Sequence, residues 1–107
     1  MTNKTTDQQT VTPFGHDLKD VITLSRFDFE DMLIYAQRYA IGRMTFASQD
    51  VCNLINAHID WISVKTLSVI KTDIEQQRDR GNLGNPTIDA PVWLATLAAI
   101  NARLEAS

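Results

Sequence analysis

The amino-acid sequence predicts an all-α protein, a small bundle of about four helices that follows a flexible N-terminal arm. Two observations predict this class. Apolar residues recur at the three- and four-residue spacing of a helical face through most of the chain after residue 25. Glycines and helix-capping side chains separate the periodic segments from one another. No stretch carries the signals of a strand, so no strand is predicted.

The composition is that of one ordinary globular domain. The chain has 107 residues, of which 44% are hydrophobic and 21% are charged, and one domain is expected at this length. We assign residues 1–15 to the flexible arm and residues 16–107 to a single helical domain. A core of this size leaves a chain marginally stable alone, which favours a homo-oligomer or docking onto a partner.

Charge and cysteine content argue against several classes of protein. The net charge of −3 provides no basic surface for nucleic acid. A single cysteine excludes an internal disulfide and fits a reducing compartment. No apolar run approaches the ~18 residues of a membrane span, and the first residues lack the apolar core of a secretory signal. A cytoplasmic protein is therefore expected.

The first helix is predicted to span residues 26–41. Ser25 precedes it as an N-cap, and Asp28 follows three positions later, where negative charge complements a helix N-terminus. Gly42 ends the helix because glycine adopts the left-handed conformation without steric cost. Before this helix, residues 16–24 are predicted to form a short docked segment or a turn of helix. The apolar spacing predicts an inward face of Phe29, Met32, Leu33, Ala36, Tyr39 and Ala40.

Three further helices are predicted over residues 48–61, 63–80 and 89–105. Ser48, Ser63 and Asp89 are their predicted caps, and Gly81 ends the third of the four. The predicted inward residues of these three helices are Val51, Leu54, Ile55, His58, Ile59, Ile62, Val64, Leu67, Ile70, Ile74, Trp93, Leu97, Ile100 and Leu104, and Leu94 and Ala98 are predicted to widen the stripe of the last helix. Short loops connect the helices, which favours a bundle.

The least ordinary side chains gather around the turn between the first two helices. The candidate interaction or anion-binding surface is Tyr35, Arg38, Tyr39, Arg43, Thr45 and Phe46. Residues three and four positions apart share one side of a helix, and an arginine beside free helix N–H groups can hold a carboxylate or phosphate. The alternative is ordinary packing, in which Tyr39 and Phe46 fill the core and Arg43 bonds to the carbonyls ending the first helix or pairs with Asp50.

No catalytic residue, metal ligand or cofactor site is predicted. Cys52 and His58 lie six positions apart and cannot face each other on a helix, and one cysteine with two histidines is a poor metal-binding set. We interpret them as a buried thiol and a helix-lining imidazole. The second helix lacks arginine and lysine and carries Asp50 and Asp60, which argues against a DNA-binding helix-turn-helix.

Residues Arg38 to Phe46 read Arg-Tyr-Ala-Ile-Gly-Arg-Met-Thr-Phe. This segment resembles a signature, Arg-Tyr-Ala-Leu-Gly-Arg-x-Thr-Tyr, of small phage- and prophage-encoded proteins without an assigned function. The similarity extends from about residue 29 to residue 100. The resemblance implies a phage protein that acts in the cytoplasm of its bacterial host, and it carries no catalytic residues to transfer.

These observations predict a non-enzymatic interaction protein that binds a host protein, for which inhibition of a host defence system is one role. The surface is expected at Tyr35 and the Arg38–Phe46 turn. One alternative is a homo-oligomer that binds an anionic small molecule, such as a nucleotide, at Arg38 and Arg43. A third interpretation, a helix-turn-helix regulator, requires strongly salt-dependent binding to duplex DNA.

Overall fold

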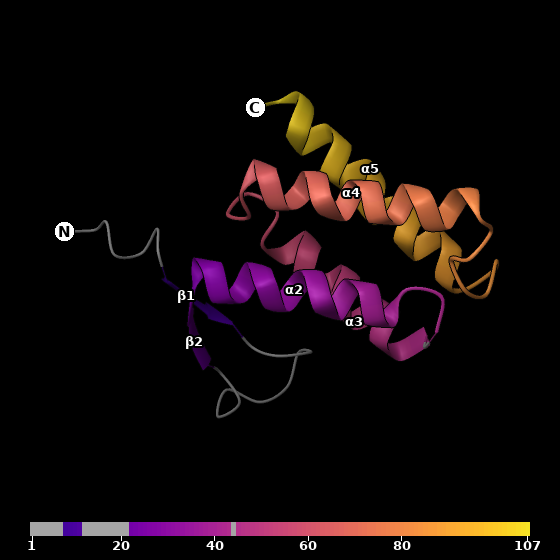
Figure 1. Cartoon of the computed structure of the whole chain (residues 1–107), viewed down its shortest axis with the longest axis horizontal. Coiled ribbons are helices and arrows are strands. Elements are labelled where there is room, and N and C mark those ends of the chain that lie inside the picture. The colour runs from indigo at the N-terminus through magenta and orange to yellow at the C-terminus, as the bar shows by residue number, and fades with distance from the viewer. Residues whose placement is uncertain (1–7, 12–21, 44) are drawn as a thin grey trace.

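The computed structural model describes residues 8–11, 22–43 and 45–107. This part of the chain contains two short strands followed by four helices (Figure 1). The elements are β1 (Gln8–Val11), β2 (Ile22–Ser25), α2 (Arg26–Ala40), α3 (Thr45–Ala57), α4 (Val64–Asp79) and α5 (Asp89–Glu105). The predicted bundle of four helices is confirmed.

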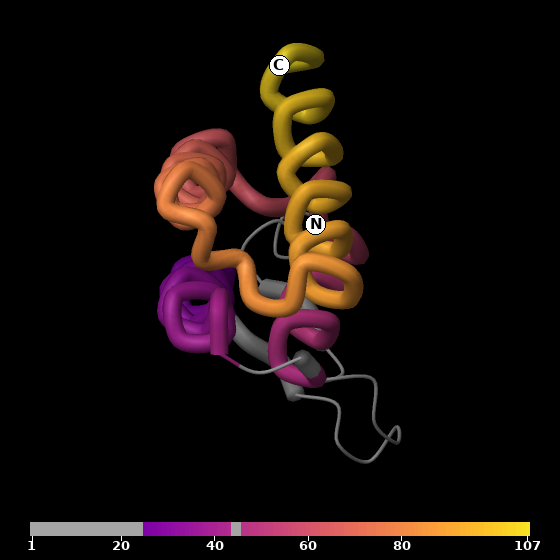
Figure 2. The backbone as a smooth tube through the Cα atoms, turned by 90° about the vertical axis from the view of Figure 1, so that its right-hand side faces the viewer, coloured from indigo at the N-terminus to yellow at the C-terminus, as the bar shows by residue number. Residues whose placement is uncertain are grey.

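The four helices form two layers. α2 and α4 lie in one layer, and α3 and α5 lie in the other (Figure 2). α2 packs against α3 and α4, and α5 packs against the same two helices. The core between the layers is built from fully buried side chains, the largest of which are Trp93, Phe29, Leu33, Ile55, Ile62, Leu67, Ile70, Ile74 and Ile100. Each helix therefore buries one stripe, as the apolar spacing requires.

The ends of α2 follow the sequence prediction closely. The Ser25 hydroxyl accepts a hydrogen bond of 3.1 Å from the backbone N–H of Asp28, so Ser25 is the N-cap. After Ala40 the chain makes a tight turn in which Ile41 has φ −63° and ψ 126° and Gly42 has φ 78°. The N–H of Arg43 closes it by donating to the Ala40 carbonyl over 3.0 Å. These values match a type II turn, whose third position favours glycine.

The predicted bounds of the second helix are wrong at both ends. α3 begins at Thr45, so Ser48 lies inside it, and the Ser48 hydroxyl donates a 3.2 Å hydrogen bond to the Ala40 carbonyl. Ser48 therefore provides a hydrogen bond to a carbonyl at the C-terminal end of α2 and does not cap α3. α3 stops at Ala57, because the N–H groups of Trp61 and Ile62 both donate to the His58 carbonyl and close a turn there.

The third predicted cap is confirmed, and the fourth is wrong. Ser63 accepts a 3.3 Å hydrogen bond from the N–H of Thr66 at the start of α4. α5 begins at Asp89 as predicted, but its N-cap position is Ile88, which makes no side-chain cap bond. The Asp89 carboxylate instead accepts a 3.0 Å bond from the N–H of Asn85 and so closes the preceding loop.

Two strands add to the helical body that the sequence predicted. β1 and β2 pair antiparallel, with Gln8 opposite Ser25 and Val11 opposite Ile22. Runs of four residues carry little alternation, and their pairing partner lies outside any local sequence window, so the strand signal was missed. Of the predicted arm, residues 1–7 and 12–15 lie outside the described part of the chain. So do residues 16–21 of the segment predicted to dock or to form a turn of helix; its last residues, 22–24, belong to strand β2, so no helical turn forms there.

Candidate functional site

One side of α2 carries large apolar side chains that face away from the core. Phe27 is 81% exposed, Tyr35 is 71% exposed and Tyr39 is 59% exposed, and Met32 is exposed beside them. Residues three and four positions apart on a helix are surface neighbours, so these side chains form one continuous strip. We call this strip the α2 face and define it as Phe27, Asp28, Asp31, Met32, Tyr35, Arg38 and Tyr39.

The exposure of Met32 and Tyr39 corrects the sequence prediction, which placed both on the inward face. Each immediately precedes a buried residue, Leu33 or Ala40. One residue along a helix is a rotation of about 100°, which is enough to move a side chain from the core to the surface. The apolar spacing of α2 fits two overlapping stripes, and packing against α3 and α4 selects the one that contains Leu33 and Ala40. Val64 of α4 is likewise exposed against prediction, as are Leu94 and Ala98 of α5.

The turn after α2 extends the exposed surface. The Arg43 guanidinium lies 5.1 Å from the centre of the Tyr39 ring, an arrangement worth about 0.5–1 kcal/mol at an exposed site. Phe46 is 79% exposed, so the packing alternative, with Tyr39 and Phe46 in the core, is wrong. Among the described residues no ion pair joins Arg43 to Asp50. Thr45 begins α3, and its side chain lies outside the described part.

Arg38 is occupied by its own fold. Its Nε donates a 2.8 Å hydrogen bond to Oδ2 of Asp73 on α4. This bond and the charge of Asp73 raise the pKa of the Arg38 guanidinium above its ordinary value. The pair links α2 to α4 across 35 residues of sequence, and no local pattern in the sequence signalled it. Arg38 thus has an ion-pair partner within its own fold, while 53% of its side chain remains exposed.

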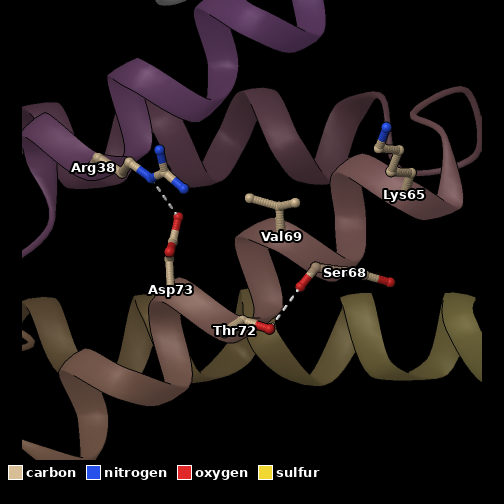
Figure 3. Close-up of a pocket in the computed structure, with 6 residues that line it drawn as sticks. All are labelled: Arg38, Lys65, Ser68, Val69, Thr72 and Asp73. Atoms are coloured by element: carbon tan, nitrogen blue, oxygen red, sulfur yellow. Dashed lines mark hydrogen bonds and ion pairs between the residues drawn. The ribbon is translucent and has the colours of Figure 1, made fainter.

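A pocket of about 400 Å³ opens beside this ion pair, between α2 and α4 (Figure 3). Its lining residues are Arg38, Lys65, Ser68, Val69, Thr72 and Asp73. Val69 lies between the Arg38–Asp73 pair and Lys65 in Figure 3. The Thr72 hydroxyl turns back to donate to the Ser68 carbonyl over 3.0 Å. The pocket therefore has an apolar centre at Val69, with the Arg38–Asp73 pair on one side and Lys65 on the other.

Gln37 is an unusual residue next to this region. It is fully buried, yet neither its amide nitrogen nor its amide oxygen has a hydrogen-bond partner within the described part of the chain. It lines a small pocket of about 190 Å³ together with Arg38, Ile41, Asp73 and Gln77. The buried amide thus lines a pocket beside the Arg38–Asp73 pair.

Cys52 and His58 occupy structural positions. Cys52 is fully buried, and burial raises the pKa of its thiol to about 12, with the Thr96 hydroxyl acting in the opposite direction. His58 places Nδ1 2.9 Å from the Leu54 carbonyl, and the centre of its ring lies 4.9 Å from that of Phe29. The two side chains face different surroundings, so the thiol has no neighbouring base among the described residues to activate it.

Within the ranges 8–11, 22–43 and 45–107, no group of three or more histidine, cysteine, aspartate or glutamate side chains is placed to hold a metal ion. In the same ranges no helix is both long and apolar enough to cross a membrane. The chain matches no family model, no curated protein and no solved structure. The resemblance of residues 38–46 to phage and prophage proteins therefore stays a prediction.

Of the predicted site residues, Tyr35, Arg38 and Tyr39 lie together on the α2 face, and Arg43 joins them through the Tyr39 ring. Sequence reasoning missed Phe27, the most exposed aromatic residue of the described part. Phe27 lies one residue before Asp28 and outside the predicted inward stripe. This position was the available signal that its side chain is exposed. Asp73 was also missed, because nothing local marks a partner so distant in sequence.

Proposed function

We propose that this protein is a non-enzymatic interaction protein that binds another protein through the α2 face. The observation that carries the proposal is the exposure of Phe27, Tyr35 and Tyr39 on this face, each more than half open to solvent, with Phe46 exposed at the start of α3. Exposed aromatic side chains contribute strongly to the free energy of binding when a partner covers them. Tyrosine and arginine are also the residue types enriched among energetic hot spots of interfaces.

The rigidity of this surface adds to the case. Phe27, Tyr35 and Tyr39 project from a regular helix, and the guanidinium of Arg43 rests against the Tyr39 ring. Side chains held in place before binding lose less conformational entropy on association. The Arg38–Asp73 pair fixes the same helix to α4. A partner would therefore meet a surface that is already ordered.

The resemblance to phage and prophage proteins makes a bacterial host protein the expected partner. On this proposal the protein acts in the host cytoplasm, and a host defence system is one target class. The resemblance bears on the biological setting, whereas a fold alone does not determine function. Partner identity is left to experiment.

The alternatives from the sequence have weaker support. A nucleotide site at Arg38 and Arg43 is weakened, because Asp73 pairs with Arg38 and would repel an anion bound there. A DNA-reading helix requires phosphate-binding side chains, and α3 (Thr45–Ala57) contains neither arginine nor lysine.

Capture from host lysate tests the proposal. The wild-type protein and the variants Tyr35→Ala and Tyr39→Ala are each immobilised at low density. The proteins that they bind are quantified by mass spectrometry. Each substitution should lower the recovery of a specific partner by about tenfold or more, since loss of a hot-spot aromatic side chain commonly has that effect. Both side chains are exposed, so the variants should retain the helical circular dichroism spectrum of the wild type.

Leu94→Ala is the matched control. Leu94 is an exposed apolar residue on α5, a helix that packs against α3 and α4. Its substitution should leave capture unchanged. Equal recovery by the wild type and both tyrosine variants would overturn the proposed role of the α2 face.

A further inference from the structure

We infer that a second copy of this chain docks on the α2 face, with the two α2 helices antiparallel and Tyr35 at the two-fold axis. The inference rests on the proposed function, that this face binds protein, and names a partner for it. Three observations support it: the order of charges along α2, the spacing of its exposed residues, and the size of the exposed aromatic surface.

Charge is distributed unevenly along the α2 face. Asp28 and Asp31 lie in its first half; both are exposed, and neither forms an ion pair within the described part of the chain. The second half and the following turn carry Arg38 and Arg43. Because Asp73 neutralises Arg38, the net charge of the second half comes from Arg43. The face is thus acidic at one end and basic at the other.

An antiparallel pair matches opposite charges, and a parallel pair does not. With Tyr35 at the axis, Asp31 lies opposite Tyr39 of the second copy, and Asp28 lies opposite the turn that follows its α2 and carries Arg43. Symmetry repeats each contact, as in every isologous dimer. A parallel arrangement would instead place Asp28 against Asp28 and Arg43 against Arg43. Like charges across an interface disfavour association.

Charged and aromatic residues also share one line along α2. Asp28, Asp31, Tyr35 and Arg38 follow one another at intervals of three and four residues, so they are surface neighbours on one side of the helix. α2 ends at Ala40, and after the turn through Gly42 the Arg43 guanidinium lies against the Tyr39 ring, at the end of this line.

The aromatic area on the α2 face is that of a weak dimer. Phe27, Tyr35 and Tyr39, side chains of ~200 Å² each that are now 59–81% exposed, would together bury on the order of 400 Å² per copy. Interfaces of this size belong to weak, transient complexes. We therefore expect dissociation in the micromolar range, and a foreign partner that uses the same face would compete with the second copy.

Sedimentation velocity over the micromolar concentration range tests the dimer. The wild type should change from monomer to dimer as its concentration rises. Tyr35→Glu places two negative charges together at the axis and should remain a monomer throughout, whereas the control Leu94→Glu on α5 should dimerise like the wild type. A wild type that remains a monomer, or a Tyr35→Glu variant that still dimerises, would overturn the inference.

A charge exchange tests the antiparallel register. Asp28→Arg should weaken the dimer by about tenfold, because the introduced guanidinium would meet Arg43 of the second copy. The double variant Asp28→Arg with Arg43→Asp should recover at least part of that loss, since opposite charges face each other again. Failure of the second change to restore association would contradict this register. If the wild type is a monomer and still captures a host protein through Tyr35, the dimer inference is wrong and the proposed function is still supported.

Discussion

Cys52 illustrates how its surroundings, more than its residue type, set the chemistry of a side chain. The thiol is fully buried in α3, and burial raises its pKa from 9.0 to about 12. Only the thiolate is an effective nucleophile, so the native protein should resist thiol reagents at neutral pH. Cys52 is therefore a packing residue, as the sequence suggested.

The raised pKa predicts a specific loss of stability in alkali. Below pH 9 the thiol is protonated in both states and adds no pH dependence. Between pH 9 and about 12 the unfolded chain releases its proton while the folded chain retains it. The free energy of unfolding then falls by up to about 1.4 kcal/mol per pH unit from this group. Urea unfolding on either side of pH 9 measures the fall.

Cys52→Ala separates this effect from other titrating groups. The substitution leaves a small cavity and lowers stability by a roughly constant amount. The wild type should therefore be more stable than Cys52→Ala by an amount that decreases as the pH rises above 9. A difference that stays constant across this range would show that the thiol does not titrate as its burial requires.

The link between α2 and α4 depends on a buried carboxylate. Glu30, only 7% exposed, accepts hydrogen bonds from the Ser63 N–H at 2.7 Å, the Ser63 hydroxyl at 3.0 Å and the Thr66 hydroxyl at 2.8 Å. These donors lie at the N-terminus of α4, where negative charge is favourable. Arg26 approaches the same carboxylate at 3.6 Å. Glu30 therefore orients the two helices as well as satisfying their polar groups.

Glu30→Ala should lower the free energy of unfolding by about 3 kcal/mol, because it leaves the start of α4 and Arg26 without their shared acceptor. Urea unfolding measures the change. Glu75→Ala is the matched control: Glu75 also makes an ion pair, of 2.8 Å with Lys71, but both side chains are about one-third exposed. Its loss should amount to less than about 1 kcal/mol. Equal effects of the two substitutions would rule out a special role for Glu30.

The turn between α2 and α3 meets the loop between α4 and α5 at Gly42. This glycine joins α2 to α3, and its main chain lies against Asn82 in the loop between α4 and α5. A Cβ atom at Gly42 would lie 2.7 Å from the Asn82 side-chain oxygen and 2.8 Å from its carbonyl oxygen. The turn that bears Arg43 is therefore positioned by a loop about forty residues later in the chain.

Gly42→Ala and Gly81→Ala should differ in their effect on stability. Both glycines have positive φ, 78° and 70° respectively, but a Cβ at Gly81 would meet nothing within 4 Å. Gly81→Ala should cost about 1–2 kcal/mol from the left-handed backbone alone. Gly42→Ala should lower the free energy of unfolding by more than Gly81→Ala does, since Asn82 must also move. Thermal unfolding of the two variants measures the difference, and a smaller loss at Gly42 would contradict this contact.

Some features of this protein were readable from local sequence. Ser25, Ser63 and Gly42 act where the sequence placed them, because capping and turn preferences arise within four residues. Ser48 did not cap its helix, because the Ala40 carbonyl eight residues earlier competes for its hydroxyl. The strand pair and the Arg38–Asp73 pair escaped prediction for a similar reason: each joins segments that are distant in the chain.

By itself the sequence determined that the body is helical, how many helices it has and where most of them end. Only the tertiary structure decided which side of α2 is covered, since the apolar spacing of that helix fits two stripes that differ by one residue. Burial of Leu33 and Ala40 against the neighbouring helices leaves Met32 and Tyr39 in solvent. The proposed binding surface is thus the stripe that remained outside the core, and its location follows from packing between helices.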